Sequence, residues 1–307
     1  MLGSNNLSTY VIIPVHDRKS TTLRCLENLK QVEALQQFQV LVIDDGSTDG
    51  TGEAVRSHYP EVEVLQGDGN LWWTGAIAEG MQYAYEQGAA FFIWLNDDCQ
   101  LGGSVLLDLV QTCQEDPRVI VGAQGVEQND PSAIAFGGKL KTWQGYRFIS
   151  VSQGHQRSCD LLSGNLVCMP REVVQKIGYP DSAQTPHYGG DSLYLIRAQK
   201  AGFHLLVSAK HPVYSLPGEP KLFPSRWLLS PGEPLKILKL VFVPQSGLSW
   251  RVWLRINWEA YSAWGLVMFL KKYCSILLIT LLRFLPLSMR KDLHKFISLK
   301  FHDPEQN

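Results

Sequence analysis

The sequence lacks cysteine pairs at the spacing of a disulfide framework or a zinc site. Its six cysteines are scattered over 307 residues, and none stands in a Cys-x-x-Cys pair. We therefore expect reduced, mostly buried thiols. The first residues, MLGSNNLSTYVIIPV, also lack the basic segment and the long apolar stretch of a secretory signal. Both absences favour a cytoplasmic protein.

An apolar run long enough to span a membrane is also missing. The uninterrupted run CSILLITLL, residues 274–282, follows Lys271 and Lys272 and precedes Arg283. It is shorter than the ~20 apolar residues that a membrane span requires. The run is typical either of a buried helix in a small helical subdomain or of a helix that lies on a membrane surface.

Net charge is nearly absent, at −1, because two opposite surpluses cancel. Residues 226–307 contain 12 Lys and Arg against 5 Asp and Glu, whereas residues 1–225 contain 16 against 24. The basic segment is also rich in Trp, Leu and Phe. As a binding partner, this composition favours an anionic membrane surface over nucleic acid, with the protein bound peripherally on the cytoplasmic face of the membrane. The alternative is an ordinary helical subdomain with a solvated basic face.

Short apolar runs alternate with amphipathic segments in the first 125 residues, and 45% of the chain is hydrophobic, enough for a real core. Strands are predicted over residues 10–15, 39–44, 61–66, 91–95 and 118–124. Helices are predicted over residues 20–36, from an N-cap at Asp49 through Val55, and over 75–88 and 104–114. This alternation indicates an α/β domain with a mostly parallel sheet and helices on both faces.

The pattern is less regular after residue 125. AIAFGGKL and GYRFISV predict a hairpin, LLSGNLVCMP a strand, and REVVQKIG a short helix that ends at Gly178. A helix is expected to begin near Asp191, and a strand over 204–211 to end at His211. The expected domains are residues 1–225 and a helical region, residues 226–307. They are joined by a proline-rich linker that contains Pro217, Pro220, Pro224, Pro231 and Pro234.

Acidic and amide side chains follow several of the predicted strands. These groups are His16-Asp17, Asp44-Asp45, Gly67-Asp68-Gly69-Asn70 and Asn96-Asp97-Asp98. The carboxyl ends of parallel strands meet at one edge of a sheet, where such sheets bind their ligands. We therefore expect a binding site lined by carboxylates at this edge.

A dinucleotide-binding motif is a rival interpretation, because GDGNLW follows a strand. It fails at Trp72, where close packing of the helix requires a third glycine. Carboxylates also repel a bare diphosphate unless a cation lies between them. Mg²⁺ and Mn²⁺ prefer oxygen ligands, and a histidine such as His211 would favour Mn²⁺. Taken alone, His211 is more typical of a partly exposed surface histidine.

Several landmarks stand in a characteristic order: VIIPVHDR, VLVIDDGSTDGT, WLNDDC, LLSGN, GGDSLYLIRAQKAGF and a late histidine. Together they resemble inverting family 2 glycosyltransferases with the GT-A fold, over roughly residues 9 to 215. The rhamnosyl- and galactofuranosyltransferase-like branch is the most similar. The resemblance implies a nucleotide-diphospho-sugar transferase fold with a C-terminal helical extension. It also implies a dTDP- or UDP-sugar donor, Mn²⁺ or Mg²⁺, and a glycan or lipid-linked acceptor in cell-surface polysaccharide synthesis.

The resemblance also implies a role for individual residues. Asp45 would hydrogen-bond the nucleotide base, in a donor pocket lined by Pro14, Val15, His16 and Asn70. Asp97 would contact ribose or diphosphate, Asp98 would bind the metal, and His211 would complete the metal site. Asp191 would be the catalytic base. Its alternative role is a helix N-cap, because Asp is a favoured cap.

Three departures from the family pattern bear on function. Trp72 and Trp73 stand where many relatives have smaller residues, so the donor sugar pocket is expected to differ in shape. Gly190 precedes the expected base, where many members have a second acid. Phe223 stands where the QxxRW signature of processive synthases has Gln, which favours transfer of a single sugar.

The predicted chemistry uses the two carboxylates differently. A metal at Asp98 would stabilise the leaving diphosphate, while Asp191 would take the proton of the acceptor hydroxyl. Glycoside hydrolysis also uses two carboxylates, but it requires neither a nucleotide pocket nor a metal. The competing class is an inactive, transferase-like scaffold at a membrane. A missing base or metal acid would indicate that class, and this sequence has both.

Overall fold

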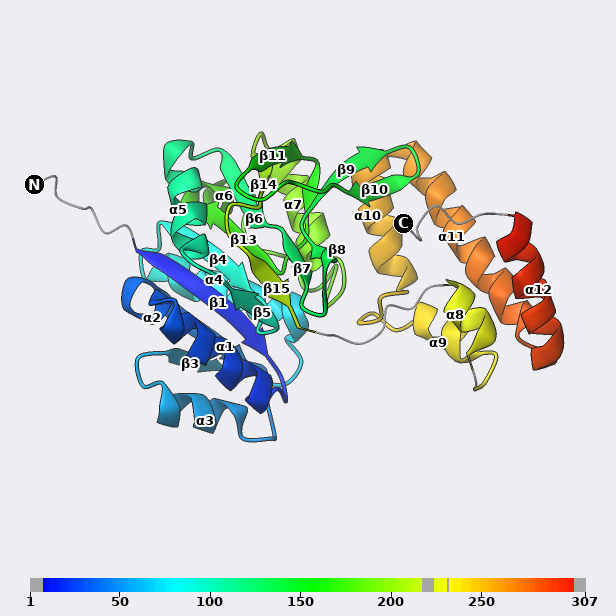
Figure 1. Ribbon diagram of the computed structural model, residues 1–307, viewed down its shortest axis with the longest axis horizontal. Coiled ribbons are helices and arrows are strands. Elements are labelled where there is room, and N and C mark those ends of the chain that lie inside the picture. Colours follow the sequence, from blue (N-terminus) through cyan, green and yellow to red (C-terminus); the bar gives the residue numbers. More distant parts are fainter. Residues whose placement is uncertain (1–7, 217–223, 231, 301–307) are drawn as a thin grey trace, which may run out of the picture. The chain divides into compact units, whose positions relative to one another are not determined.

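The computed structural model describes residues 8–216, 224–230 and 232–300 (Figure 1). The chain divides into two compact units, residues 1–218 (unit 1) and 219–307 (unit 2). Outside the described residues lie Phe223 and three prolines of the expected linker, Pro217, Pro220 and Pro231.

Unit 1 is built on an eight-stranded sheet with the order β11-β14-β6-β13-β4-β1-β2-β3. Its strands are β1 (Thr9–Val15), β2 (Gln39–Asp44), β3 (Glu63–Gln66), β4 (Phe91–Leu95), β6 (Val119–Ala123), β11 (Gln156–Cys159), β13 (Leu166–Pro170) and β14 (His204–Ser208). β13 runs antiparallel to both neighbours and β11 runs antiparallel to β14, whereas the other pairs are parallel. The predicted mostly parallel sheet is therefore confirmed.

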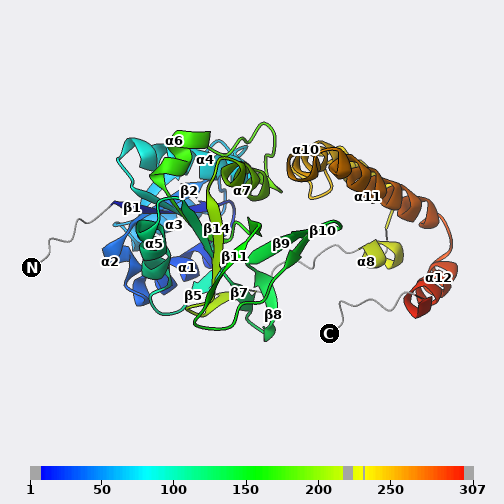
Figure 2. The same cartoon turned by 90° about the horizontal axis from the view of Figure 1, so that it is seen from above.

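Helices cover both faces of this sheet. They are α1 (Lys19–Gln31), α2 (Ala34–Gln37), α3 (Thr51–His58), α4 (Trp72–Glu86), α5 (Val105–Glu115), α6 (Arg171–Ile177) and α7 (Gly190–Lys200). Figure 2 shows α4, α6 and α7 on one side of the strands and α1 and α5 on the other. Successive side chains of β1 point to opposite faces of the sheet. Those of Val11 and Ile13 therefore pack in the hydrophobic core that also contains residues of α1, α3 and α5. Ile12 meets α4, where a Cβ at Gly80 would lie 2.4 Å from its Cγ2 atom.

Two smaller sheets complete unit 1. One has the order β5-β15-β7-β8, with β5 (Cys99–Leu101), β15 (Val213–Ser215), β7 (Gly125–Glu127) and β8 (Asp130–Phe136). The other has the order β10-β9-β12, with β10 (Gly145–Phe148), β9 (Gly138–Thr142) and β12 (Leu161–Leu162). The expected hairpin is therefore β9–β10, whereas AIAF belongs to β8 and pairs with β7.

Four local predictions differ from the structure. The helix predicted over 20–36 breaks at Glu33, whose φ is 60°, and continues as α2. The N-cap of α3 is Gly50 rather than Asp49, although Asp49 accepts hydrogen bonds from the backbone of Thr51 and of Lys19. LLSGNLVCMP divides into β12 and β13. β14 ends at Ser208, so His211 does not end a strand.

Unit 2 is helical, as expected for the C-terminal region. Its helices are α8 (Pro224–Leu229), α9 (Lys236–Val241), α10 (Trp250–Tyr261), α11 (Ala263–Leu282) and α12 (Leu287–Lys300). A small core contains Trp227, Ile237, Val241, Leu248 and Ile276. Five cysteines are buried and Cys274 on α11 is exposed, in agreement with the expected free, mostly buried thiols.

Candidate active site

A cavity of about 330 Å³ lies at the carboxyl ends of β1, β2, β3 and β4, beside the N-terminus of α4. Its lining consists of Pro14, Val15, His16, Arg18, Asp45, Gly69, Trp72, Trp73, Ala76, Asn96, Asp97, Asp98 and His187. The structure therefore brings together six of the residues predicted for the donor and metal sites. The acidic strand ends meet at one edge because the strands that carry them are parallel.

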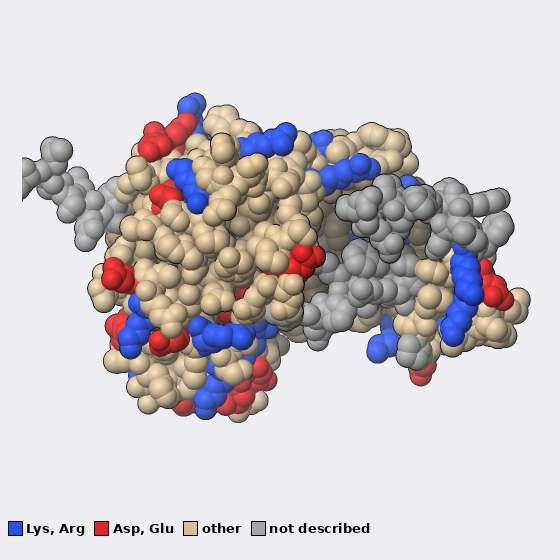
Figure 3. Space-filling view, viewed as in Figure 1, with Lys and Arg blue, Asp and Glu red and all other residues tan. Residues whose placement is uncertain are grey.

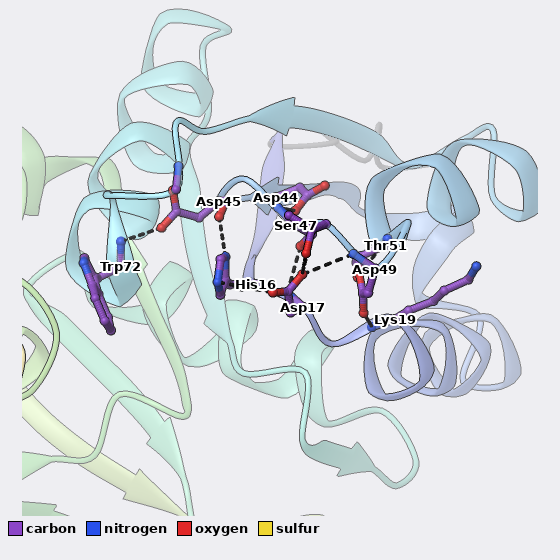
Figure 4. A network of polar contacts seen from close by, with 11 residues as sticks. His16, Asp17, Lys19, Asp44, Asp45, Ser47, Asp49, Thr51 and Trp72 are labelled. Atoms are coloured by element: carbon purple, nitrogen blue, oxygen red, sulfur yellow. Dashed lines mark hydrogen bonds and ion pairs between the residues drawn. The ribbon is translucent and has the colours of Figure 1, made fainter.

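Asp45 organises the loop that precedes α4 (Figure 4). Its Oδ1 atom accepts hydrogen bonds from the backbone N–H groups of Gly69 and Leu71, at 2.8 and 3.1 Å. Its Oδ2 atom accepts one from Trp72 N at 2.7 Å. A carboxylate is favourable here because it faces the unpaired N–H groups of a helix N-terminus. An ionised carboxylate has about four acceptor sites, so Asp45 retains capacity for a ligand.

The loop after β1 is tied to the loop after β2. His16 Nδ1 lies 2.5 Å from the carbonyl oxygen of Asp45. The Oδ1 atom of Asp17 accepts hydrogen bonds from the backbone of Thr48 and of Asp49, at 2.6 and 3.2 Å. The Thr48 N–H in particular holds the pKa of Asp17 below its ordinary value. Figure 4 shows His16 between the two loops, so the wall of the cavity is held by several contacts.

Asp97 is already paired. Arg18 Nε lies 2.9 and 3.0 Å from the two carboxylate oxygens of Asp97, and Arg18 Nη2 lies 2.8 Å from its Oδ1 atom. Thr22 Oγ1 donates a further hydrogen bond at 3.1 Å. Such a charge-assisted fork fixes both groups. Sequence reasoning did not identify Arg18, and its signal is a cation three residues after the end of β1.

Asp98 differs from its neighbour. Its Oδ1 atom is buried and, within the described part of the chain, has no hydrogen-bond partner. Arg18 Nη2 is 3.9 Å from the other oxygen, Oδ2. Burial and the adjacent charge of Asp97 raise the pKa of Asp98, while Arg18 opposes them. An unpaired buried carboxylate oxygen is costly unless a ligand uses it, and divalent cations take such oxygens as ligands.

His211 and Asn70 lie away from this cavity, contrary to expectation. β15 runs antiparallel to β5 and pairs Ser215 with Cys99, so Leu216 donates its N–H to the Asp98 carbonyl at 2.9 Å. His211 precedes the other end of β15, and its Nε2 atom pairs with Asp108 of α5. Asn70 is exposed, and its backbone N–H is bonded to Asp68. Among the described residues, no group of three or more His, Cys, Asp or Glu side chains is arranged to hold a metal.

Asp191 is not among the residues that line the cavity. It is the second residue of α7, whose N-cap is Gly189 with φ 81°, so it is not the N-cap. Its Oδ2 atom accepts a hydrogen bond from Gly164 N at 2.9 Å. A Cβ at Gly164 would lie 2.6 Å from Asp191 Cβ and 3.1 Å from the ring of Trp73, which lines the cavity. Gly164 therefore touches both Asp191 and Trp73, which places Asp191 close to the cavity lining.

Gly190 occupies the position where many family members have a second acid, and the structure explains why it is glycine. A Cβ at this position would lie 2.0 Å from Thr74 Oγ1 and 2.9 Å from Thr74 Cγ2. Thr74 is fully buried in the first turn of α4. The close contact between α4 and α7 therefore excludes a larger residue at position 190.

His187 is a cavity residue that sequence reasoning missed. Its ring centroid lies 5.4 Å from that of Trp72 and 4.5 Å from that of Tyr188. Its Nδ1 atom is buried and has no hydrogen-bond partner in the described ranges. Burial lowers the pKa of His187. Trp72 itself is 42% exposed and has φ 55°, a backbone strain that often marks a functional residue. The only sequence signal was the His-Tyr pair before two glycines.

Known proteins share both the sequence pattern and the fold. Residues 10–178, more than half of the chain, match the model of "Glycosyl transferase family 2". Glycosyltransferase AglE of Haloferax volcanii is 26% identical over 200 residues, which cover 64% of this chain and 62% of that protein. The matches span less than two thirds of the length of each curated relative.

Two solved structures are similar at low sequence identity. GalNAc-T7 with UDP, GalNAc and Mn²⁺ superposes with a TM-score of 0.58 at 15% identity, over 88% of this chain and 54% of that one. TarS 1-349 of S. aureus in complex with UDP gives a TM-score of 0.55 at 12% identity, over 90% of each chain. They confirm the expected GT-A fold, and together with the matching family model they lead to one conclusion: the chain belongs to the Glycosyl transferase family 2.

Proposed function

We propose that this glycosyltransferase moves one hexose from a nucleotide-sugar donor to a hydroxyl group, with inversion at the anomeric carbon and with the help of a divalent metal. The observation that carries the proposal is the buried, unpaired Oδ1 atom of Asp98, in a cavity built on four carboxyl-end loops. The donor is a dTDP- or UDP-sugar of the kind used by the rhamnosyl- and galactofuranosyltransferase-like branch. The acceptor is a glycan or lipid-linked glycan in cell-surface polysaccharide synthesis.

The residues present fit a divalent cation at Asp98. Carboxylate oxygen is the ligand type that Mg²⁺ and Mn²⁺ take, and the unpaired Oδ1 atom of Asp98 offers one such ligand. When bound, the metal supplies Lewis-acid stabilisation of the leaving diphosphate. Arg18, held by Asp97, adds a fixed positive charge beside this position. That charge favours a diphosphate even before a cation arrives.

The donor is held by the remaining lining. Asp45 keeps the loop before α4 in place and offers an acceptor to the nucleotide, beside Pro14, Val15 and His16. Burial keeps the imidazole of His187 neutral near pH 7, so its unpaired Nδ1 atom is available for a hydroxyl of the sugar. The ring of Trp72 beside it provides a flat surface against which a sugar can pack.

Asp191 is the proposed catalytic base. In an inverting transfer, a carboxylate takes the proton of the acceptor hydroxyl as that oxygen attacks the anomeric carbon. Asp191 lies close to the cavity residue Trp73, across Gly164, and the backbone N–H of Gly164 donates a hydrogen bond to its carboxylate. Contacts between a catalytic base and its substrate often tighten only when the substrate binds, so Asp191 is expected to reach the acceptor hydroxyl in the complex.

The first test is a thermal-shift panel of UDP, dTDP, GDP and CDP, each with Mn²⁺, with Mg²⁺ and with EDTA. A ligand that binds only the folded state raises its apparent stability, so the matching nucleotide should shift the midpoint in the presence of metal. Sugar transfer and donor hydrolysis are then measured with that nucleotide's sugars. Nucleotide binding without metal-dependent turnover for any donor would favour the alternative, an inactive scaffold. Turnover that is insensitive to EDTA would remove the metal from the proposal.

A further inference from the structure

Helix α11 directs its more apolar face to solvent. Six residues of this face, here called the α11 stripe, are between 43% and 58% exposed: Leu266, Val267, Leu270, Leu277, Leu278 and Leu281. Their spacing places them on one side of the helix. α11 is long and apolar enough to cross a membrane. In its most apolar segment of 18 residues, only 17% is buried by the rest of the protein. The apolar run predicted from the sequence is thus part of a longer, mostly uncovered 20-residue helix.

Packing within unit 2 keeps the stripe outward. A Cβ at Gly265 would lie 2.0 Å from the carbonyl oxygen of Asn257, so α11 packs closely against α10 there. Ile276 and Thr280, on the same covered face, are 4% and 1% exposed. Lys272 lies with its ammonium 3.2 Å from the centre of the Trp253 ring on α10. Rotating the stripe inward would break all of these contacts.

Exposed apolar residues also follow α11 in the sequence. Phe284, Leu287 and Met289 are 62%, 44% and 52% exposed. A single exposed leucine is ordinary, but soluble monomers rarely expose a contiguous apolar patch of more than a few hundred Å². A surface of this length is therefore expected to have an occupant.

Charge and aromatic residues favour a lipid bilayer as that occupant. Lys271, Lys291 and Lys295 are exposed, in a region of the sequence where Lys and Arg outnumber Asp and Glu by 12 to 5. Figure 3 shows Lys and Arg mixed with Asp and Glu on unit 1, which lacks that surplus. Trp258 and Trp264 are 57% and 45% exposed, and tryptophan prefers the interface between lipid headgroups and acyl chains.

The same features disfavour a membrane span. Lys271 and Lys272 stand at the middle of α11, where a spanning helix would carry them to the bilayer centre at considerable cost. A helix that lies in the plane of the interface instead leaves Lys271 among the headgroups and inserts only its apolar side, by roughly 5–10 Å.

We infer that unit 2 is a monotopic membrane-binding module, in which the α11 stripe inserts into the surface of an anionic bilayer while α11 lies parallel to the membrane plane. This inference does not depend on the proposed function. It would hold the enzyme on the cytoplasmic face, where a lipid-linked acceptor is within reach.

Cys274 provides a native probe for the test. It is exposed on α11 near the stripe, whereas the other five cysteines are buried. The full-length protein is labelled there with an environment-sensitive fluorophore. It is then mixed with vesicles of phosphatidylcholine alone, or of phosphatidylcholine in which about one lipid in three is the anionic phosphatidylglycerol. We expect a blue shift with the anionic vesicles that is weaker at high salt. We also expect quenching by spin labels near the headgroups rather than at the bilayer centre.

Matched variants separate the stripe from general hydrophobicity. Combined Leu270→Gln, Leu277→Gln and Leu281→Gln substitutions should reduce vesicle binding at least about tenfold, since each removes an inserted apolar side chain. Leu107→Gln in α5 and Leu235→Gln beside α9 change leucines that are equally exposed, at 45%, and should leave binding unchanged. Circular dichroism and the melting temperature check that every variant is folded.

Three results would overturn the inference. Quenching at the bilayer centre would mean that α11 spans the membrane. No spectral change with any vesicle, together with dimers detected by light scattering, would mean that a second copy of the chain covers the stripe. Equal loss of binding in the control variants would mean that the stripe has no special role.

Discussion

Strand β4 of unit 1 and helix α11 of unit 2 are both strongly apolar, but only β4 is covered. All five residues of β4 are buried, because neighbouring strands flank it and helices pack on both faces of the sheet. In α11 the described helices of unit 2 cover only part of the apolar surface, so most of its apolar residues face solvent. Apolar character thus predicts that a surface will be covered, but the topology determines whether the protein itself covers it.

The two units also differ in where their charged side chains lie and in what these side chains contact. Unit 1 concentrates carboxylates at one sheet edge and fixes most of them with N–H groups or Arg18. Unit 2 leaves Lys271, Lys291 and Lys295 at the surface, in a region with exposed apolar side chains. This division suggests that chemistry resides in unit 1 and attachment in unit 2, and the following predictions test that separation.

The largest expected effect comes from Asp191→Asn. The amide keeps the shape of the side chain but cannot accept the proton, so turnover should fall by about 10²- to 10⁴-fold. Nucleotide affinity and vesicle binding should stay as in the parent. Steady-state transfer kinetics with the identified donor measure the effect, and Asp130→Asn, at an exposed carboxylate of β8 outside the cavity lining, is the control. Turnover close to that of the parent would remove Asp191 from the mechanism.

Asp98→Ala should abolish the metal-dependent part of nucleotide binding. With nucleotide at 100 times its dissociation constant, the parent should gain about 2.7 kcal/mol of stability, and the variant should lose most of this gain. Thermal shifts with and without Mn²⁺ measure the difference. Asp68→Ala changes an exposed carboxylate after β3 and should retain the metal effect. If both variants respond to Mn²⁺ as the parent does, the cation binds elsewhere.

Gly190→Ala should destabilise unit 1 by about 1–3 kcal/mol, because the new methyl group overlaps Thr74 and overpacked contacts cost about that much. The double variant Thr74→Ala/Gly190→Ala removes the overlapping atoms and should recover part of the loss. Urea unfolding of Gly190→Ala, of Thr74→Ala and of the double variant gives the coupling free energy between the two positions. Additive losses would show that the two helices do not meet as described.

The smallest effect on nucleotide binding is expected from truncation after residue 218. Unit 1 has its own core, so its nucleotide affinity should change by less than about twofold, a difference of roughly 0.4 kcal/mol. Binding to anionic vesicles should be lost from the same protein. Calorimetry and vesicle flotation measure the two properties side by side. An insoluble fragment, or one with much weaker nucleotide affinity, would show that the units are not separable.

The sequence by itself determined most of the strands and helices in the first 125 residues, although not α2 or β5, and the gathering of acids at one sheet edge. These follow from local periodicity and from the fact that parallel strands end on the same side. It also determined the apolar face of α7, since Leu193, Leu195, Ile196 and Ala198 are all buried there.

Only the tertiary structure decided which side chains meet. Asp97 is paired with Arg18, whereas the adjacent Asp98 keeps an unpaired oxygen, and no spacing distinguishes the two. His187 reaches the cavity and His211 does not, because the loop before α7 and the pairing of β15 with β5 set their positions. Likewise, the sequence showed the apolar run over residues 274–282, but neither the 20-residue helix that contains it nor which face of that helix is covered. Covering depends on contacts between segments far apart in sequence, such as Gly265 with Asn257 and Gly190 with Thr74, and local patterns do not encode those contacts.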